Sequence, residues 1–337
     1  MIGNYVGTDV DGNALGNAFR AIDIVGSSDN LITENVVIGN HAGQIIDRGA
    51  CCNRIVRNWF GVTRDGRIIA RNRAENGIAV NESFNLIFGN VFGGIRFNSL
   101  FLTGQAGTVV ETIIAGNTFL GGSPTEPLSG IAIGADAASR MFVGGSTDAF
   151  RNSIRGGETG IVLRQGVGRT FVLGNFIGTD DGMLLPMESA IDTGPSASTF
   201  VQDNRIANIA GTGVVVHGPT NRVSRNSIYG CQKGPLDARA GSDVPAPPAI
   251  RGVTLTEVTG TACGGCTVEV FSDTGAQARW YEGTTVADAS GRFTLNRSIL
   301  RGGWVTATAT DGRGSTSVLS AAVPAPPPLP RRRAVRR

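Results

Sequence analysis

The stretch TFVLGNFI (170–177) shows the pattern that decides the fold of this chain. The pattern is N/T-x-Φ-x-x-N-x-Φ, where Φ is apolar, and a truncated copy opens the chain at GNYVG (3–7). A unit that recurs about every 20–50 residues is typical of a solenoid, in which each copy forms one coil. The copies are NLITENVV (30–37), NRIVRNWF (53–60), NLIFGNVF (85–92), TIIAGNTF (112–119), TDAFRNSI (147–154), TFVLGNFI (170–177), TFVQDNRI (199–206) and NRVSRNSI (221–228).

Each copy consists of two short strand segments joined by a corner. Side chains alternate along a strand, so the first and third positions share a face, as do the sixth and eighth. The apolar residues there are mostly β-branched or aromatic, which suits strands. A third strand follows, as in GIAV (77–80), GIVL (160–163) and GVVV (213–216). Three strands per coil, without a helical period, predict an all-β parallel β-helix of about nine coils.

An asparagine occupies the sixth position of every coil. Coils stacked about 4.8 Å apart would let each carboxamide donate to the next one and accept from the last. We therefore interpret these residues as a structural ladder, not as a ligand site. They are Asn4, Asn35, Asn58, Asn90, Asn117, Asn152, Asn175, Asn204 and Asn226.

One coil in two carries an outward excursion, at 7–17, 61–72, 121–130 and 178–189. Excursions on alternate coils line up along one side of a solenoid, and that side often binds ligands. Four aspartates in the excursions are explained most simply as turn residues that accept hydrogen bonds from their own backbone. Weak Ca²⁺ binding is the alternative. These residues are Asp9, Asp11, Asp180 and Asp181.

The repeat, with the segments GNYVGTDVDG (3–12) and GNFIGTDDG (174–182), resembles known proteins. The repeat resembles those of right-handed parallel β-helices of the pectate-lyase superfamily. The two segments resemble a narrower group of bacterial secreted β-helix proteins that end in small Ig-like modules. The resemblance covers about residues 2–323 and implies a right-handed solenoid. It leaves the activity open, because this superfamily includes lyases, hydrolases, epimerases and non-catalytic scaffolds.

A proline-rich break ends the repeats, and short alternating segments separated by turns follow it, as expected for a β-sandwich. We expect this module to cover the C-terminal edge of the solenoid or to extend toward a cell surface. The predicted organisation is a β-helix (1–241), a linker (242–249), an Ig-like β-sandwich (250–323) and a disordered Pro- and Arg-rich tail (324–337).

The charge pattern narrows the class of partner. The formal net charge of the chain is +3, and the last seven residues contain five arginines. Without these seven residues the chain is slightly acidic. A slightly acidic chain without interleaved basic and aromatic residues is not expected to bind nucleic acid. No apolar run predicts a membrane span. The chain opens on a repeat without a signal peptide, so we expect the natural start to lie upstream.

The cysteines offer one pair with a recognisable spacing. Cys263 and Cys266 flank a tight turn between two predicted strands. A redox motif would need a helix N-terminus there, and a zinc site would need two further ligands. We predict a small structural disulfide, which would imply an oxidising compartment. Cys51, Cys52 and Cys231 are interpreted as ordinary buried or corner residues.

The outward positions of the third strand offer one pair of candidate catalytic carboxylates. If Ile22 and Ile46 are equivalent inward residues, Asp23 and Asp47 lie at equivalent outward positions, about 5 Å apart on consecutive coils. Such a pair could bind Ca²⁺ or share acid/base work on a glycosidic bond. The simpler interpretation is a solvated pair on an exposed strand. Neither histidine has a visible partner in the sequence.

The function favoured by this pattern is an extracellular or cell-surface scaffold that contacts a polysaccharide or another surface polymer along one face, with no cofactor other than Ca²⁺. The alternative is a polysaccharide lyase, glycoside hydrolase or epimerase, which would need an acid/base cluster with an Arg or Lys in a groove. A third interpretation is an adhesion module in which the C-terminal module is the binder.

Overall fold

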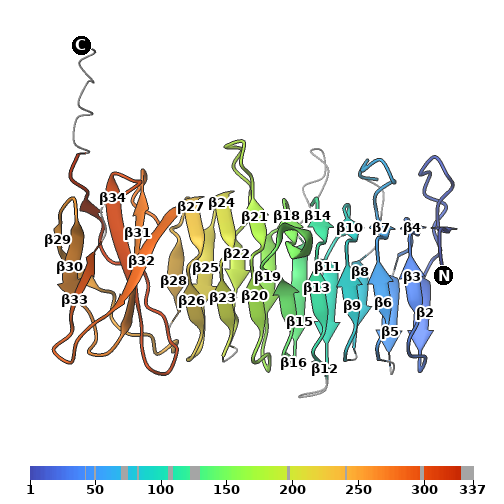
Figure 1. Cartoon of the computed structure of the whole chain (residues 1–337). Helices are drawn as coiled ribbons and strands as arrows, with labels where there is room; N and C mark the ends of the chain where they lie inside the picture. Colours follow the sequence, from blue (N-terminus) through green and yellow to red (C-terminus); the bar gives the residue numbers. More distant parts are fainter. Residues whose placement is uncertain are drawn as a thin grey trace, which may run out of the picture.

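The computed structural model describes residues 1–41, 43–48, 51–69, 75–81, 83–104, 109–121, 130–195, 198–239, 241–296 and 300–327. The excursion predicted at 121–130 and most of the predicted tail lie outside the described residues. In the described part the protein is all-β, with stacked parallel sheets in one elongated body followed by antiparallel sheets (Figure 1).

Sheet 1 has eight parallel strands built from the first half of the repeat. In chain order they are β3 (Leu31–Thr33), β6 (Arg54–Val56), β9 (Leu86–Phe88), β13 (Ile113–Ala115), β17 (Phe142–Gly144), β20 (Phe171–Leu173), β23 (Phe200–Gln202) and β26 (Arg222–Ser224).

Sheet 2 has nine parallel strands built from the second half of the repeat. They are β1 (Tyr5–Val6), β4 (Val36–Val37), β7 (Trp59–Phe60), β10 (Val91–Phe92), β14 (Thr118–Phe119), β18 (Ser153–Ile154), β21 (Phe176–Gly178), β24 (Arg205–Ile209) and β27 (Ser227–Cys231).

Sheet 3 has nine parallel strands built from the third segment of each coil. They are β2 (Arg20–Val25), β5 (Gly43–Arg48), β8 (Asn76–Val80), β11 (Asn98–Thr103), β15 (Ile131–Asp136), β19 (Thr159–Leu163), β22 (Ser189–Asp192), β25 (Thr212–Val216) and β28 (Leu236–Ala238). A small parallel pair, β12 (Val109–Val110) and β16 (Ala138–Ser139), lies beside these sheets.

The fifth copy of the repeat starts earlier than the sequence predicted. Its first strand is β17, and a single 3-10 turn, η1 (Asp148–Phe150), lies between this strand and Asn152. Met141 therefore stands where other coils have Asn or Thr, and it is fully buried. The pattern match at 147–150 is a corner, not a strand.

The corner between sheets 1 and 2 contains the asparagine ladder. Each Nδ2 donates to the Oδ1 of the next asparagine at 2.9–3.1 Å, from Asn4 to Asn226. The residue before the asparagine has a left-handed backbone in every coil of the ladder except that of Asn152, where Arg151 has a φ of −64°. Glycine adopts this conformation without strain, as at Gly116 (φ 65°) and Gly174 (φ 63°). The ladder therefore satisfies buried amides while the chain turns sharply.

The core runs along the axis between the sheets as columns of like residues. Phe60, Phe92 and Phe119 stack with ring centroids 5.0 and 4.8 Å apart, and all three side chains are buried. Parallel strands in register place the same repeat position in neighbouring coils, so a column of one residue type follows from the repeat.

The C-terminal module consists of two antiparallel sheets. One contains β29 (Ala249–Val253), β30 (Glu257–Thr261) and β33 (Arg292–Asn296), and the other contains β32 (Trp280–Val286), β31 (Thr267–Asp273), β34 (Trp304–Thr310) and β35 (Val323–Pro324). The module has its own buried cluster, which includes Val268, Val270, Phe293 and Val305.

This module covers the C-terminal edge of the solenoid (Figure 1). This is the first of the two placements that we expected from the sequence. The backbone of Ile228 exchanges two hydrogen bonds with Ala278, at 2.9 and 3.0 Å. The Thr316 amide donates to the Asn221 carbonyl, and the Thr316 hydroxyl accepts from the Val223 amide at 3.0 Å. The last strands of sheets 1 and 2 thus have partners for edge groups that would otherwise be open to other chains.

Candidate functional site

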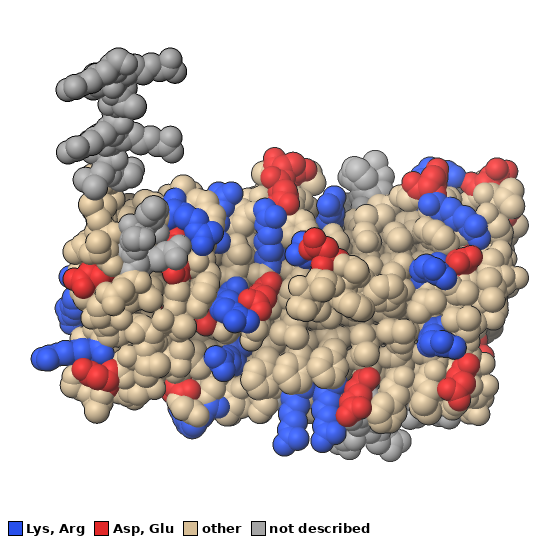
Figure 2. All heavy atoms as spheres, in the orientation of Figure 1, with Lys and Arg blue, Asp and Glu red and all other residues tan. Residues whose placement is uncertain are grey.

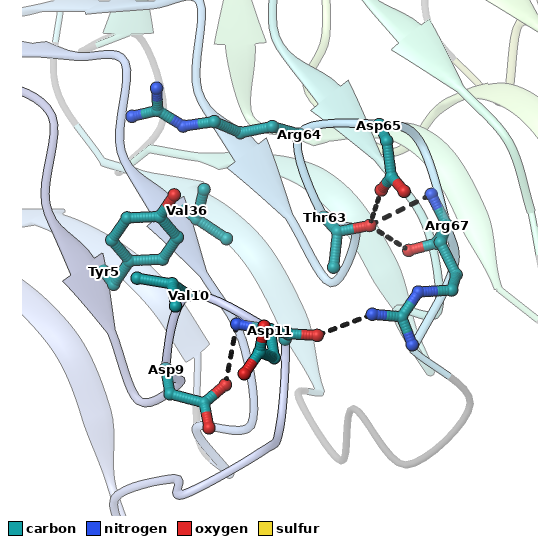
Figure 3. Close-up of a pocket in the computed structure, with 10 residues that line it drawn as sticks. Tyr5, Asp9, Val10, Asp11, Val36, Thr63, Arg64, Asp65 and Arg67 are labelled. Atoms are coloured by element: carbon teal, nitrogen blue, oxygen red, sulfur yellow. Dashed lines mark hydrogen bonds between the residues drawn. The ribbon is translucent and has the colours of Figure 1, made fainter.

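The excursions after β1, β7 and β21 project from one edge of the solenoid (Figure 1), and a cavity of about 300 Å³ lies between the first two of them. Figure 3 shows Tyr5 and Val10 on one side of this edge pocket and Thr63, Asp65 and Arg67 on the other. The fold therefore brings Asp9 and Asp11 to a pocket, together with residues more than fifty positions away.

The polar groups of the edge pocket bond mainly to one another. Arg67 donates from Nη2 to the Asp11 carbonyl at 2.6 Å, which ties the two excursions together. Arg64 lies over the rings of Tyr5 and Trp59, at 5.5 and 5.2 Å from their centroids. These contacts stabilise the two loops and leave few polar groups of the edge pocket available to bind a ligand.

Asp9 fits the turn interpretation. Its carboxylate accepts from the side chain and backbone of Asn13, at 2.7 and 2.8 Å, and from the Asp11 amide at 3.0 Å. The bonds from Asn13 hold the pKa of Asp9 below its ordinary value. The Thr63 hydroxyl, which bonds to the Asp65 carboxylate, lowers the pKa of Asp65 in the same way.

Asp180 and Asp181 lie on the third of these excursions, in a separate cluster. The Met183 amide donates to Asp181 at 2.9 Å, and this bond lowers the pKa of its carboxyl. Asp180 pairs with Arg205, whose guanidinium also donates to the Tyr229 hydroxyl at 2.7 Å. Within the described ranges, no three His, Cys, Asp or Glu side chains gather as metal ligands. Ca²⁺ binding at these turns stays a prediction.

The predicted alignment of Asp23 with Asp47 is wrong by one residue. The strand register pairs Asp23 with Ile46 and Asp47 with Ile24, and Ile22 with Ile45. A shift of one residue places two positions on opposite faces of a strand. Asp23 is exposed and pairs with Arg20 at 2.9 Å, and the side chain of Asp47 lies outside the described part. The sequence could not reveal the shift because Ile45 and Ile46 are both plausible inward residues.

The cysteines form two disulfides. One joins Cys263 to Cys266 across the turn before β31. The other joins the neighbours Cys51 and Cys52, which we expected from the sequence to be ordinary buried or corner residues. Cys231 is free and buried, and burial raises the pKa of its thiol to about 12.

A further cluster on the outer face of sheet 3 was missed by sequence reasoning. His217 Nε2 lies 3.2 Å from the Asp192 carboxylate, and both side chains are about one-third exposed, at 31% and 29%. Asp192 also accepts from the Gly194 amide at 2.8 Å. In the sequence, only the outward position of Asp192 hinted at this pair. His217 follows strand β25 in the next coil, so it comes close to Asp192 only when the coils are stacked.

The outer face of sheet 1 carries a column of aromatic side chains. Phe142, Phe171 and Phe200 are register partners on β17, β20 and β23. Their rings stack with centroids 5.1 and 5.0 Å apart, and Phe142 is 39% exposed. Because the rings cover one another's faces, they turn mainly their edges, the positive part of the ring quadrupole, toward solvent.

A second column, at the corner that precedes sheet 1, flanks these rings. It contains Glu111, Arg140, Arg169 and Ser198, all with a left-handed backbone. Arg140 pairs with Glu111 at 3.5 Å, and both side chains are about half exposed. The two columns together line an open pocket of about 400 Å³, which we call the aromatic groove. Among the described residues that line it, Glu111 is the single carboxylate.

The aromatic groove continues onto the C-terminal module. A second pocket of about 290 Å³ shares Ser198 and Phe200 with it and adds Thr220 and Arg222 of the solenoid. Its other wall is formed by Thr267 and the turn 310–314 of the module. We call this second space the junction pocket. The sequence did not reveal either pocket, because the residues that line them come together only after the coils are stacked in register.

On the face drawn in Figure 2, the charged side chains of the described residues do not form a field of one sign. Figure 2 shows acidic and basic side chains interspersed over the visible face. No helix in the described part of the chain is long and apolar enough to cross a membrane.

No family model and no curated protein matches the sequence. The A-module of a mannuronan C-5 epimerase, AlgE6, of Azotobacter vinelandii is 13% identical over 65% of this chain and 58% of its own length, with a TM-score of 0.42. PfbA, a surface adhesin of Streptococcus pneumoniae, is 12% identical over 90% of this chain and 65% of its own, with a TM-score of 0.35. The enzymatically active domain of tailspike protein 2 of bacteriophage CBA120 is 9% identical over 96% of this chain and 71% of its own length, with a TM-score of 0.20. The chain spans less than two thirds of the first two proteins, and likenesses of this degree assign no function.

Proposed function

We propose that this chain is an extracellular or cell-surface scaffold that binds a polysaccharide, or another surface polymer, along the aromatic groove. The observation that carries the proposal is the solvent-facing column of Phe142, Phe171 and Phe200 beside Arg140 and Arg169. Three aromatic side chains at one outward position, in three consecutive coils, form an apolar stripe of the kind that marks an interaction surface.

A linear polymer suits this surface because the site repeats once per coil, at about one strand spacing. A polysaccharide offers apolar C–H groups that can pack against the exposed edges of the stacked rings, and hydroxyl oxygens that can accept from guanidinium groups. Arg169 projects at the rim as an exposed donor. The groove thus combines an apolar floor with a few polar groups, as ligand sites commonly do.

The lining of the groove favours binding over chemistry. Hydrolysis of a glycosidic bond commonly uses two carboxyl groups at a fixed separation. Among the described lining residues, Glu111 lies at one end and is paired with Arg140, and Asp311 lies beyond the other end and is paired with Arg313 at 3.0 Å. These two carboxylates belong to different pockets and cannot flank one bond.

The proposal extends to the whole chain. We infer a right-handed β-helix of about nine coils in residues 1–241, a linker at 242–249, an Ig-like sandwich at 250–323 and a tail at 324–337. Two disulfides support an oxidising compartment, because such bonds persist outside the reducing cytosol. A bacterial secreted protein with this organisation fits the role of a surface scaffold.

A second candidate function rests on Asp192 and His217. An imidazole beside a carboxylate can serve as a general acid or base, so this pair is a candidate centre for a lyase, hydrolase or epimerase. Turnover of neutral or uronate-containing polysaccharides that is lost in His217→Ala and kept in Phe171→Ala would establish the enzyme and contradict the scaffold.

Binding to a panel of neutral and acidic polysaccharides, measured by affinity electrophoresis, tests the scaffold. We expect Phe171→Ala to weaken binding about tenfold, because the central ring of the column is lost. Phe101→Ala is the matched control: Phe101 lies on the outer face of sheet 3 under Arg164, at 5.6 Å from its guanidinium. Equal losses in both variants, or no binding by the parent chain, would overturn the proposal.

A further inference from the structure

Arg222 occupies the point where the aromatic groove meets the C-terminal module. It is the register partner of Phe200, so it continues the outward column of Phe142, Phe171 and Phe200 by one coil. Its neighbours Asn221 and Val223 both bond to Thr316 of the module. The backbone of Arg222 is therefore held firmly between the two modules.

The side chain of Arg222 has a polar atom without a protein partner. Its Nε is buried and donates to no acceptor among the described residues. Buried donors are nearly always paired, and each exception needs an explanation. The guanidinium lines the junction pocket, so an acceptor supplied by a ligand there could satisfy the donor.

The charges along the two pockets are unequal. Arg140, Arg169, Arg222 and Arg313 line them, against Glu111 and Asp311. Glu111 pairs with Arg140, and Asp311 pairs with Arg313. Arg169 and Arg222 are the basic side chains of the lining that form no ion pair within the described residues. The buried Glu269 carboxylate lies near enough to Arg222 to interact with it electrostatically, so it offsets part of that charge. The exposed ring edges between Arg169 and Arg222 are also positive.

We infer that the binding site is composite: the turn 310–314 of the C-terminal module completes the groove, and Arg222 binds an anionic group of a linear acidic polysaccharide there. This inference rests on the proposed function and specifies its ligand. A planar guanidinium forms strong charge-assisted hydrogen bonds with carboxylate or sulfate oxygens, and more strongly where water is excluded. The C-terminal module is thus part of the binding surface as well as a cover for the solenoid edge.

Arg222→Gln tests the inference with three probes: a neutral glucan, a polyuronate and a sulfated galactan. We expect roughly ten- to hundredfold weaker binding of a charged polymer, as for loss of a charge-assisted hydrogen bond, and unchanged binding of the glucan. The polyuronate and the galactan distinguish carboxylate from sulfate. Arg54→Gln is the matched control, because Arg54 occupies the same outward column on β6, outside both pockets.

Gly312 allows a test that leaves Arg222 and its contacts in place. A Cβ added at Gly312 meets no atom within 4 Å, and the residue lines the junction pocket. Gly312→Asp should weaken, and Gly312→Lys should strengthen, binding of the charged polymer by up to about fivefold. Gly303, on the same module and equally open, is the control position for the same two substitutions.

The outcomes separate the two proposals. If Phe171→Ala weakens binding while Arg222→Gln and both Gly312 variants bind the charged polymers like the parent, the scaffold stands and the composite site is refuted. Equal losses in Arg54→Gln and Arg222→Gln would also refute it, since a general charge effect would then suffice. If the parent binds none of the three polymers, both proposals fail.

Discussion

Asparagine recurs at the sixth position of the repeat because its carboxamide is satisfied on both sides in a buried corner. Asn152 donates from Nδ2 to the Ile114 carbonyl at 2.8 Å and to Asn175 at 2.9 Å. Its Oδ1 accepts from the backbone and side chain of Asn117, both at 3.0 Å. A hydroxyl is too short to span coils in this way, and a carboxylate could not donate.

Replacing Asn152 by alanine should cost about 1–3 kcal/mol of unfolding free energy, because it leaves donors and acceptors of its neighbours unpaired in a buried corner. Equilibrium denaturation measures the loss. Asn4→Ala is the control: Asn4 is the exposed end of the ladder, so its loss should stay below about 1 kcal/mol. Similar stability of the Asn152 variant and the parent would contradict the ladder.

The cysteines allow a prediction at the scale of single side chains. The chain has five cysteines, of which Cys231 alone is free. After denaturation without reductant, alkylation of protein from an oxidising compartment should label one thiol, as measured by mass. In the native protein Cys231 should stay unlabelled near neutral pH, because its pKa is raised by burial. Three labelled thiols in the denatured, unreduced protein would show that one of the two disulfides is absent.

The strands are short, and their stability comes from stacking between coils. Parallel register places one repeat position directly over the same position in the next coil, so like residues form columns. Columns of like charge would repel, and the exposed corners instead pair opposite charges: Glu34 with Arg57 at 3.3 Å and Asp203 with Arg225 at 2.8 Å.

Phe92 tests the contribution of the inner column. Its ring lies between those of Phe60 and Phe119, so Phe92→Ala should lose packing on both sides and cost about 3–5 kcal/mol. Phe92→Leu, which keeps most of the volume, should cost less than half as much. Chemical denaturation measures both variants, and a cost below about 1 kcal/mol for alanine would mean that adjacent coils collapse into the space.

At the scale of the whole molecule, one buried carboxylate ties the C-terminal module to the solenoid. Glu269 of β31 accepts from the Ser224 hydroxyl at 2.5 Å and from the Arg225 amide at 2.8 Å. Burial raises the pKa of Glu269 above its ordinary value. The hydrogen bonds from Ser224 and the Arg225 amide oppose that shift, as do the positive charges of Arg222 and Arg225. The ionised carboxylate of Glu269 is therefore less favourable in the folded protein than in the unfolded chain.

This shift predicts how pH affects stability. Because the folded-state pKa of Glu269 is raised, its contribution to stability is fully present below its ordinary pKa of 4.5 and is lost as pH rises through the folded-state value. The difference in unfolding free energy between the parent and Glu269→Gln should therefore shift in favour of the parent as pH falls toward 4.5. A difference that is constant from neutral pH to pH 4.5 would contradict the raised pKa.

The sequence by itself determined the coil. The spacing of asparagine and apolar residues indicated strands, a corner and a parallel stack, because hydrogen-bonding capacity and side-chain alternation are local properties. The same spacing placed Asn4 to Asn226 in one ladder. It failed where local alternatives were equal: Ile45 and Ile46 both fit the core position, and residues 147–150 match the pattern without forming its strand.

Only the tertiary structure decided the candidate site. Phe142, Phe171 and Phe200 are separated by about one coil each in the chain and become one surface through register. Arg222 and the turn 310–314 meet because the C-terminal module docks on the last strands of the solenoid. His217 reaches Asp192 because β22 and β25 of consecutive coils lie side by side in register. Proximity between coils depends on the number of residues in every corner, and that is a property of the whole stack.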